Sequence, residues 1–353
     1  MNTFLKDELP QNPKILLIKL RSIGDVIYNT SVYKPIKKAW KNARLTVIVE
    51  PSAYDIVRYH PDVDEVLIFK KGSIINQIGF YLKLRRERYD VAIDMHEGPR
   101  GAAMCFLSGA RFRVGNDFAK RAFFYNVRLN FSEYNPMLPI DYQAGLVRKM
   151  GVSVENPRPL ISIASKSRHL AKIILKENRI GSNDSFCVVH PGARVYDQWQ
   201  YKKFAEFADR FHKSSGLKVV LTCGPGQENQ VQEVQKHIQT AEHAFIQTGL
   251  QELAAITERS HFVFCHNGGY MHLAAALGKP VIAMFGHSNP AIWKPLGEGH
   301  IVLHHKLDCF PCTLKSMHAN CLKGKPECKE SIGVEEVLQA ADKIMRNRDQ
   351  TNK

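Results

Sequence analysis

The 353-residue sequence contains no long uninterrupted hydrophobic run. A helix that crosses a bilayer needs about 18 or more consecutive apolar residues, and no segment approaches that length. The polar start, Met1 to Pro13, also lacks the apolar stretch of a secretory signal. We therefore expect a protein that is made and kept in the cytoplasm.

Acidic residues are scarce relative to basic ones. The 34 Asp and Glu residues stand against 49 Lys and Arg residues, which gives a net charge of +15. This charge favours a polyanionic partner, such as a nucleic acid, an anionic membrane face or a phosphorylated glycolipid; a basic enzyme without such a partner is the alternative. Because the basic residues are scattered and no nucleic-acid-binding module is recognisable, we do not expect nucleic acid.

Low-complexity tracts and convincing repeats are also absent, and expected strands alternate with expected helices instead. The length and the hydrophobic fraction of 44% predict two well-packed domains. The alternation predicts an α/β fold with parallel sheets covered on both faces. The expected strands are residues 14–20, 44–49, 65–69 and 90–94 in the first half, and 186–190, 218–223, 244–246, 262–265 and 281–286 in the second.

The domain junction is expected near the proline-punctuated segment 156–159. This predicts one Rossmann-like domain over residues 1–165 and a second over residues 166–353. A last helix is expected at about residues 334–346 and is assigned to the second domain. The alternative is that this helix packs back on the first domain.

Glycine loops follow several expected strands. Gly268 and Gly269 precede a short helix expected over residues 270–277, and adjacent glycines at a helix mouth let the backbone approach a ligand closely. The unpaired N–H groups of the first turn favour an anion, with phosphate as the first choice; a tight βα loop without a ligand is the alternative. In open α/β sheets, ligands bind beyond the carboxyl ends of the strands, where further glycine loops occur at 24–25, 190–192 and 224–226.

Four of these segments, taken in order, resemble glycosyltransferase family 9, and in particular its lipopolysaccharide heptosyltransferases. The segments are Ile15 to Asp25, His190 to Arg194, Cys223 to Glu228 and Gly269 to Ala276. The resemblance implies a GT-B fold, in which two Rossmann-like domains face one another across a cleft. It also implies inverting transfer of a heptose from a nucleotide-diphosphate donor, with ADP-heptose expected, to the lipopolysaccharide inner core at the cytoplasmic face of the inner membrane.

The resemblance also implies roles for individual residues. Asp25 is the expected general base for the attacking acceptor hydroxyl; capping of a helix that begins at Val26 is the alternative role for the same aspartate. The acceptor, an anionic glycolipid, is expected in the first domain, at Lys19, Arg21, Ser22 and Gly24.

The donor is expected in the second domain. Amides of the helix mouth and basic side chains take over the electrostatic task of a metal ion, so no metal or other cofactor is expected for transfer. For His272, a hydrogen bond to a neighbouring loop is the alternative, and for Glu228 it is a solvated place in the first turn of a helix. The expected donor residues are Arg194, Glu228, Asn267, Gly268, Gly269, Tyr270, Met271 and His272.

Two positions depart from the family pattern. Asn267 stands where the family usually has aspartate, and Asp197 stands where it usually has a lysine that would lie near the donor phosphates. Arg194 is a candidate replacement for that positive charge. A family member with another nucleotide sugar and glycan acceptor therefore stays open as an alternative, as does a catalytically silent protein that binds glycolipid or nucleotide.

Two further features remain. Cys309, Cys312, Cys321 and Cys328 lie close together in the sequence; zinc is an alternative there, less favoured than reduced thiols because a second close C-x-x-C pair is absent.

Basic stretches at 34–41 and 85–88 fall on expected helices of the first domain. A solvated helix face is the simpler interpretation, and peripheral docking to an anionic membrane is the sharper one.

Overall fold

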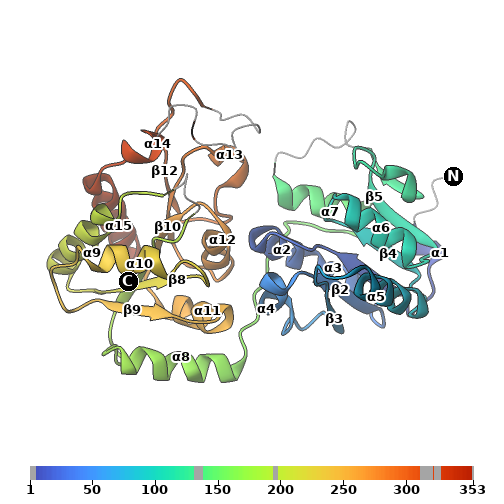
Figure 1. Cartoon of the computed structure of the whole chain (residues 1–353), viewed down its shortest axis with the longest axis horizontal. Coiled ribbons are helices and arrows are strands. Elements are labelled where there is room, and N and C mark those ends of the chain that lie inside the picture. The colour runs from blue at the N-terminus through green and yellow to red at the C-terminus, as the bar shows by residue number, and fades with distance from the viewer. Residues whose placement is uncertain (1–4, 131–137, 194–197, 311–320, 322–326, 352–353) are drawn as a thin grey trace. The chain divides into compact units, whose positions relative to one another are not determined.

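The computed structural model describes residues 5–130, 138–193, 198–310, 321 and 327–351. The chain divides into two compact units, Met1–Ser162 and Ile163–Lys353. Figure 1 shows that each unit contains a central sheet with helices packed around it.

The first unit is built on a parallel six-stranded sheet. The strands follow the order β3-β2-β1-β4-β5-β6, and β1 is central, with Ile15 opposite Leu45 on one side and Val91 on the other. Four residues of β1 and all of β4 are buried, as expected for strands covered on both faces. The strands are β1 (Lys14–Ile18), β2 (Arg44–Val49), β3 (Glu65–Ile68), β4 (Val91–Asp94), β5 (Phe112–Asn116) and β6 (Val127–Leu129).

Helices follow the strands and cover the sheet. Leu16 and Ile18 of β1 share a core cluster with Leu84 of α5 and Cys105 of α6, so these two helices pack on the same face. The helix that follows β1, α2, packs against α7. The helices are α1 (Leu5–Glu8), α2 (Ile23–Asn29), α3 (Tyr33–Ala39), α4 (Tyr54–Val57), α5 (Ile74–Arg86), α6 (Pro99–Leu107) and α7 (Pro139–Lys149), with 3-10 turns η1 (Thr30–Val32), η2 (Pro51–Ala53) and η3 (Ala122–Phe124).

The helix expected from Val26 to about Trp40 is interrupted. It forms as α2, η1 and α3, and α2 begins three residues earlier, at Ile23. At the break, the Thr30 hydroxyl donates to the Ile27 carbonyl and the Ser31 hydroxyl donates to the Tyr28 carbonyl, each at 2.7 Å. Such local bonds compete with the regular helical pattern, which explains the break.

The second unit repeats this plan. Its parallel sheet has the order β12-β11-β10-β7-β8-β9. The strands are β7 (Phe186–His190), β8 (Lys218–Cys223), β9 (Ala244–Gln247), β10 (Val263–His266), β11 (Val281–Met284) and β12 (Ile301–Leu303). The helices are α8 (Ser165–Glu177), α9 (Tyr201–Ser215), α10 (Glu228–Gln235), α11 (Leu250–Arg259), α12 (Gly269–Ala276), α13 (Pro290–Trp293), α14 (Glu327–Glu330) and α15 (Val334–Thr351).

An aromatic core lies between this sheet and α9. Phe204, Phe207 and Phe211 recur on one face of α9 and share a core cluster with Phe264 of β10 and with Trp199. The last helix, for which packing on the first domain was an option, lies against α9, β11 and β12 of the second unit. The second unit therefore has an apolar core of its own.

Both sheets have the same topology. If the strands of each unit are numbered in chain order, both read 3-2-1-4-5-6. The order reverses between β1 and β4 in the first unit and between β7 and β10 in the second, and ligands of such sheets bind at this reversal. Among the residues that the structure describes, no helix is both long enough and apolar enough to pass through a membrane.

Candidate functional site

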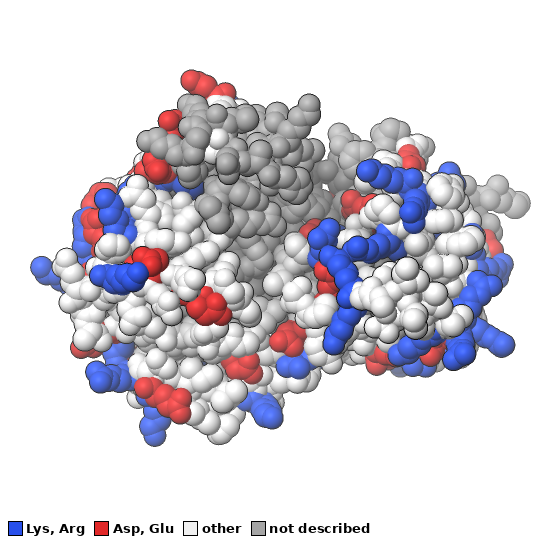
Figure 2. All heavy atoms as spheres, viewed as in Figure 1, with Lys and Arg blue, Asp and Glu red and all other residues white. Residues whose placement is uncertain are grey.

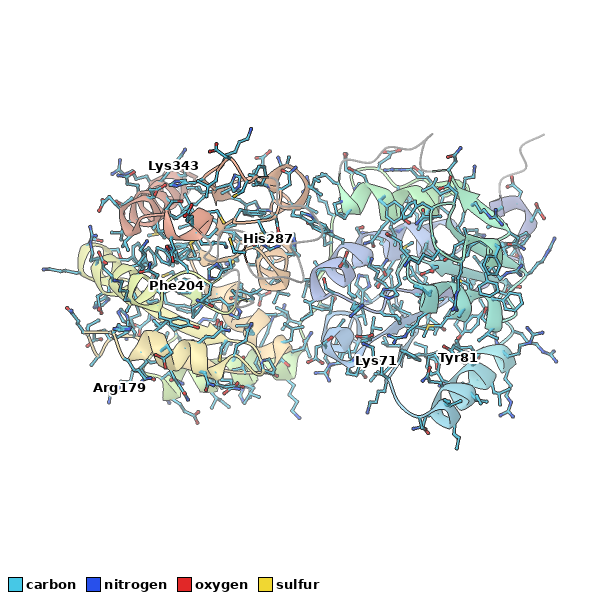
Figure 3. All side chains as sticks on the ribbon, turned by 45° about the horizontal axis from the view of Figure 1, so that its top comes forward. Lys71, Tyr81, Arg179, Phe204, His287 and Lys343 are labelled. Carbon is cyan, nitrogen blue, oxygen red and sulfur yellow. The ribbon has the colours of Figure 1, made fainter. Side chains whose placement is uncertain are left out.

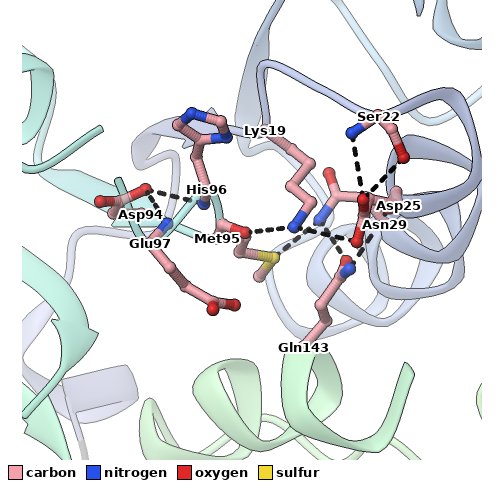
Figure 4. Close-up of polar contacts among 9 residues, drawn as sticks. All are labelled: Lys19, Ser22, Asp25, Asn29, Asp94, Met95, His96, Glu97 and Gln143. Atoms are coloured by element: carbon pink, nitrogen blue, oxygen red, sulfur yellow. Dashed lines mark hydrogen bonds and ion pairs between the residues drawn. The ribbon is translucent and has the colours of Figure 1, made fainter. Parts of the chain in front are cut away.

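The loops that leave β1 and β4 lie together at the reversal point of the first sheet (Figure 4). Lys19 follows β1 and is buried, and its ammonium donates to the carbonyl oxygen of Met95, the residue after β4, at 2.7 Å. The same Nζ lies 3.6 Å from Oδ1 of Asp25. Lys19 therefore joins the two loops and places a positive charge beside the Asp25 carboxylate.

Asp25 lies in the first turn of α2. Its Oδ2 accepts hydrogen bonds from the Ser22 backbone N–H at 3.0 Å and from the Ser22 hydroxyl at 2.8 Å. Ser22 is the N-cap of this helix, so the alternative in which Asp25 caps a helix from Val26 is wrong in detail. Asp25 is instead the partner of the cap at the third helical position, where a carboxylate also suits the helix dipole.

The other predicted acceptor residues surround this pair in sequence. Gly24 is buried, whereas Arg21 and Ser22 are exposed at the end of the β1 loop. Behind the loop, the side chain of Gln143 on α7 donates to the Asp25 carbonyl at 3.2 Å and accepts from the Asn29 amide at 2.9 Å. This buried network fixes α2 against α7, and with it the position of the Asp25 backbone.

The loop after β4 contains residues that sequence reasoning did not select. Asp94 is buried, and its Oδ1 accepts from the backbone N–H groups of His96 at 2.8 Å and Glu97 at 3.3 Å, while Tyr125 donates to Oδ2 at 2.6 Å. Burial raises the pKa of Asp94 to about 6, although these hydrogen bonds oppose the rise. The space for this carboxylate depends on Gly101, because an added Cβ would lie 2.1 Å from Oδ1.

His96 and Glu97 are thereby held at the reversal point. Burial lowers the pKa of His96 to about 4, and the positive charges of Lys19 and Arg21 add to this effect. Glu97 has a left-handed φ of 63°, which is rare for a residue other than glycine, and burial raises the pKa of its carboxyl. A neutral imidazole and a carboxyl in strained backbone at this edge are typical of a functional site.

Three of the recognised segments come together in the second unit, at the carboxyl edge of β7, β8 and β10. The Ala193 N–H donates to the Gln230 side chain of α10, and the Gln230 amide donates back to the Ala193 carbonyl, both at 2.9 Å. The imidazole of His190 lies against the ring of Tyr270, with centroids 4.5 Å apart. The loop after β7 is therefore bound to the starts of both α10 and α12.

Glycine is required where these loops meet. A Cβ on Gly192 would lie 2.3 Å from Oε1 of Gln227 and 2.8 Å from Nε2 of His190. His190 itself is buried, with Nδ1 3.1 Å from the Thr222 hydroxyl, and burial lowers its pKa to about 4. The imidazole is therefore neutral at physiological pH and contributes packing and polarity rather than charge.

The helix mouth of α12 forms as the glycines predict. Gly268 is exposed, with no atom within 4 Å of a hypothetical Cβ, and α12 begins at Gly269. The side chains that follow point elsewhere: Met271 is in the core, and the Tyr270 hydroxyl lies 2.7 Å from the Thr257 hydroxyl. His272 is also buried on α12. At these positions, it is the backbone N–H groups that are available for an anion.

The remaining predicted donor residues differ in their surroundings. Glu228 begins α10, where its Oε1 accepts from the Gly226 N–H at 3.0 Å and from the Gln247 side chain; backbone hydrogen bonds lower its pKa. Asn267 donates through its N–H to the Met284 carbonyl at 2.9 Å, and its buried Oδ1 has no partner among the described residues. Arg194 and Asp197 lie outside the described residues.

A buried lysine lies beneath the same edge and was not foreseen. Lys329 of α14 has no exposed surface, and its ammonium lies 3.0 Å from Nδ1 of His266 and donates to the Met284 carbonyl at 2.9 Å. His266 ends β10, directly before Asn267, and burial together with the Lys329 charge lowers its pKa well below the usual value. A positive charge is thus fixed under the loop that leads to the α12 helix mouth.

The predicted cysteine cluster is only partly within the described residues. Cys309 is a free thiol, Cys321 and Cys328 are half-buried, and Cys312 lies outside those residues. Within the described ranges, no group of three or more His, Cys, Asp or Glu side chains is arranged to hold a metal ion.

Solved structures with the same arrangement define the fold. A glycosyl transferase family 9 structure from Veillonella parvula DSM 2008 matches with a TM-score of 0.82 at 24% identity, covering 95% of this chain and 97% of the other. The Escherichia coli heptosyltransferase WaaC with ADP matches with a TM-score of 0.71 at 17% identity, covering 94% and 99%. The two six-stranded parallel sheets and these matches show a GT-B fold.

The family follows from the sequence comparison. The family model for glycosyltransferase family 9 (heptosyltransferase) matches residues 79–323, which is more than half of the chain. The lipopolysaccharide heptosyltransferase 2 of Escherichia coli K12 is 26% identical over 310 residues, covering 81% of this chain and 86% of that protein. The chain belongs to glycosyltransferase family 9 and is a glycosyltransferase of the heptosyltransferase type, which confirms the family, fold class and enzyme class predicted from the sequence.

Proposed function

We propose that this enzyme transfers a heptose from ADP-heptose to a hydroxyl of the lipopolysaccharide inner core, with inversion at the anomeric carbon. The observation that carries the proposal is the duplicated topology. It brings Lys19 and Asp25 to the reversal point of one sheet, and the α12 helix mouth to the reversal point of the other. A relative of the same fold binds ADP, which supports the nucleotide.

On the acceptor side, Asp25 is the general base. It takes the proton of the attacking hydroxyl as the new glycosidic C–O bond forms and the bond between the anomeric carbon and the diphosphate oxygen breaks. Lys19 and Ser22 hold the carboxylate in place, and Arg21, exposed on the same loop, contacts an anionic group of the acceptor. ADP leaves with both electrons of the broken bond, and the proton of the acceptor hydroxyl stays on Asp25.

On the donor side, the diphosphate is bound by the N–H groups of Gly268 to Met271 at the start of α12. Lys329 adds a fixed positive charge beneath this loop, with Arg194 as a further contact, whereas the buried His272 side chain is not expected to reach the donor. Glu228 accepts from a ribose hydroxyl, and the Asn267 amide faces the donor. These groups stabilise the negative charge that develops on the leaving diphosphate, so we propose that transfer needs no divalent metal and is insensitive to chelators.

The proposed acceptor is an anionic glycolipid, so we also propose that the enzyme works as a peripheral protein at the cytoplasmic face of the inner membrane. The net charge of +15 supports attraction to that surface. We propose accordingly that the first unit holds the acceptor and the second unit holds the donor.

Two measurements test the reaction. Thermal-shift assays across ADP, UDP and GDP sugars should show the largest stabilisation with ADP-heptose, because a ligand that binds only the folded state raises apparent stability. Asp25→Asn should abolish transfer and leave the ADP-heptose shift unchanged. An unchanged transfer rate in this variant would rule out Asp25 as the base.

The alternatives give different outcomes in the same panel. Preference for another nucleotide sugar would favour a family member with a different donor, an option kept open by Asn267 and Asp197. Asn267 still offers the oxygen acceptor that aspartate would offer, without its charge. No response to any nucleotide, together with no transfer, would favour a silent binding protein.

A further inference from the structure

We propose that α5 docks the first unit on an anionic phospholipid bilayer by inserting its exposed apolar side into the headgroup region. The proposal rests on the proposed function in one respect, since a membrane-borne acceptor gives the enzyme a reason to reach this surface. The docking surface comprises Ile74, Ile75, Ile78 and Leu82.

One side of α5 is accounted for by the fold. Leu84 is buried, and the half-buried Phe80 and Tyr81 pack against the same core, with the Phe80 ring 5.3 Å from the Phe69 ring. Gln77, Phe80, Tyr81 and Leu84 are spaced as one helical stripe. Figure 3 shows Tyr81 on the side of α5 that faces the rest of the unit, and Lys71 on the loop that enters the helix.

The other side exposes aliphatic side chains that the fold does not use. Ile74 is 76% exposed, Ile75 79%, Ile78 52% and Leu82 52%, and no other large aliphatic side chain among the described residues is as exposed. Ile74, Ile78 and Leu82 follow one another at intervals of four, so they form a continuous stripe. Scattered apolar residues on a surface are ordinary, whereas a contiguous stripe indicates an interaction site.

The charges around this stripe identify the occupant. The α5 sequence contains no Asp or Glu, and its last turn carries Lys83, Arg85 and Arg86. Lys71 and Lys83 approach Glu50 at 3.8 Å and Glu65 at 3.7 Å, yet both stay 53% exposed. Figure 2 shows blue side chains, with some red ones between them, bordering uncharged surface at the edge of the first unit where Figure 1 places α5. An exposed aliphatic stripe with a basic border complements an anionic membrane surface.

A second copy of the chain is a poorer occupant. Two copies meeting through α5 would bring Lys83, Arg85 and Arg86 against the same residues, with no acidic side chain of the helix to offset them. Anionic headgroups beside acyl chains offer the opposite charge and an apolar layer together.

The test is co-sedimentation of the full-length protein with vesicles of phosphatidylglycerol and phosphatidylcholine, compared with vesicles of phosphatidylcholine alone. We expect the protein to bind the anionic vesicles, and Ile75→Ser with Ile78→Ser to weaken binding by about tenfold, because insertion strength scales with buried apolar area. Lys83→Glu with Arg86→Glu should weaken it as well. The control, Leu170→Ser with Ile173→Ser, changes two exposed aliphatic residues of α8 and should bind as the unchanged protein does.

Several results would overturn the proposal. One is that the isoleucine variant binds anionic vesicles as well as the unchanged protein does, and another is that the control loses as much binding as the isoleucine variant. A third is that the unchanged protein forms a concentration-dependent dimer that the isoleucine variant does not form, which would show that a second copy covers α5. Unchanged circular dichroism and melting temperature verify that the variants fold. The vesicle assay needs no donor, so it can succeed where the proposed reaction fails; conversely, the isoleucine variant should retain transfer to a soluble, deacylated acceptor.

Discussion

Lys329 lies outside the recognised segments, yet it places a positive charge beside the proposed donor site. Its ammonium is buried between the ends of β10 and β11, against His266 and the Met284 carbonyl. In the protein interior a charge is weakly screened, so its influence on a bound diphosphate is larger than in water. The lysine that the family usually has at position 197 is absent, and Lys329 offers a positive charge from a different element.

Lys329→Met should therefore weaken ADP binding by about tenfold, which corresponds to about 1.4 kcal/mol. Isothermal titration calorimetry on the full chain measures this directly. Lys343→Met, at an exposed position of α15, is the matched control and should bind ADP with unchanged affinity. Equal affinities in the two variants would show that Lys329 has only a structural role.

His60 gives a prediction about stability and pH. Its side chain is buried beside Tyr33, and burial lowers its pKa to about 4 from the usual value of 6.5. Between these values the unfolded chain binds a proton that the folded chain does not. The free energy of unfolding therefore falls as the pH drops from 6.5 towards 4, by up to about 1.4 kcal/mol per pH unit for this residue.

His60→Asn should reduce this pH slope, even if the smaller side chain lowers stability at every pH. Urea unfolding of the first unit, followed by circular dichroism at several pH values between 4 and 6.5, measures the slope. The same slope in wild type and His60→Asn would contradict the assignment.

Residues near the proposed active site differ in how far they could be predicted. Asp25 and Gly268–Gly269 are recognisable because local order carries their signal, namely a strand, a loop and a helix start. Asp94, Gln143 and Lys329 act on residues tens of positions away, as Lys329 does on His266. Nothing in their own neighbourhood of the sequence indicates those partners, so tertiary contact alone identifies them.

At the scale of elements, the glycines of two helices have opposite surroundings. Gly101 is in the first turns of α6, where an added Cβ would lie 2.1 Å from the Asp94 carboxylate. Gly79 is in α5, where an added Cβ meets no atom within 4 Å. Packing against Asp94 therefore excludes a larger residue at Gly101, whereas at Gly79 the glycine only costs the helix backbone entropy.

Gly101→Ala should destabilise the first unit by about 1–3 kcal/mol, because the buried Asp94 carboxylate must move. Gly79→Ala should stabilise it by about 0.5–1 kcal/mol, since alanine is the better residue in a helix interior. Thermal or urea unfolding of the two variants side by side provides the test. Destabilisation by Gly79→Ala, or no effect of Gly101→Ala, would contradict this account.

Most elements were predictable because their patterns are local. Apolar runs marked β1, β2, β7 and β8, and Gly278 with Pro280 marked the end of α12. The break between α2 and α3 was not predicted, because it depends on hydroxyl groups of Thr30 and Ser31 that bond to the helix backbone. The apolar stripe of α5 is visible in the sequence, but its exposure depends on which face of the helix the sheet covers.

At the scale of the whole molecule, the two units repeat one topology with different contents. The alternation of strands and helices predicted two Rossmann-like domains. The order 3-2-1-4-5-6 in both sheets explains why three of the four recognised segments lie on or directly after β1, β7 and β10, the strands that flank the reversal points. Strand order itself could not be read from the sequence, because it depends on which strands pair and not on where they occur. Each unit has its own core, centred on α5 and α6 in the first and on α9 in the second.

This independence gives the last prediction. Because the segments assigned to the donor all lie in the second unit, a protein limited to residues 163–353 should fold and bind ADP. Residues 1–162 should fold without binding it. Calorimetric titration of both parts, with circular dichroism to verify folding, measures the two affinities. ADP binding by residues 1–162 would reverse the assignment of the domains, and failure of a folded 163–353 to bind would show that donor binding requires residues of the first unit as well.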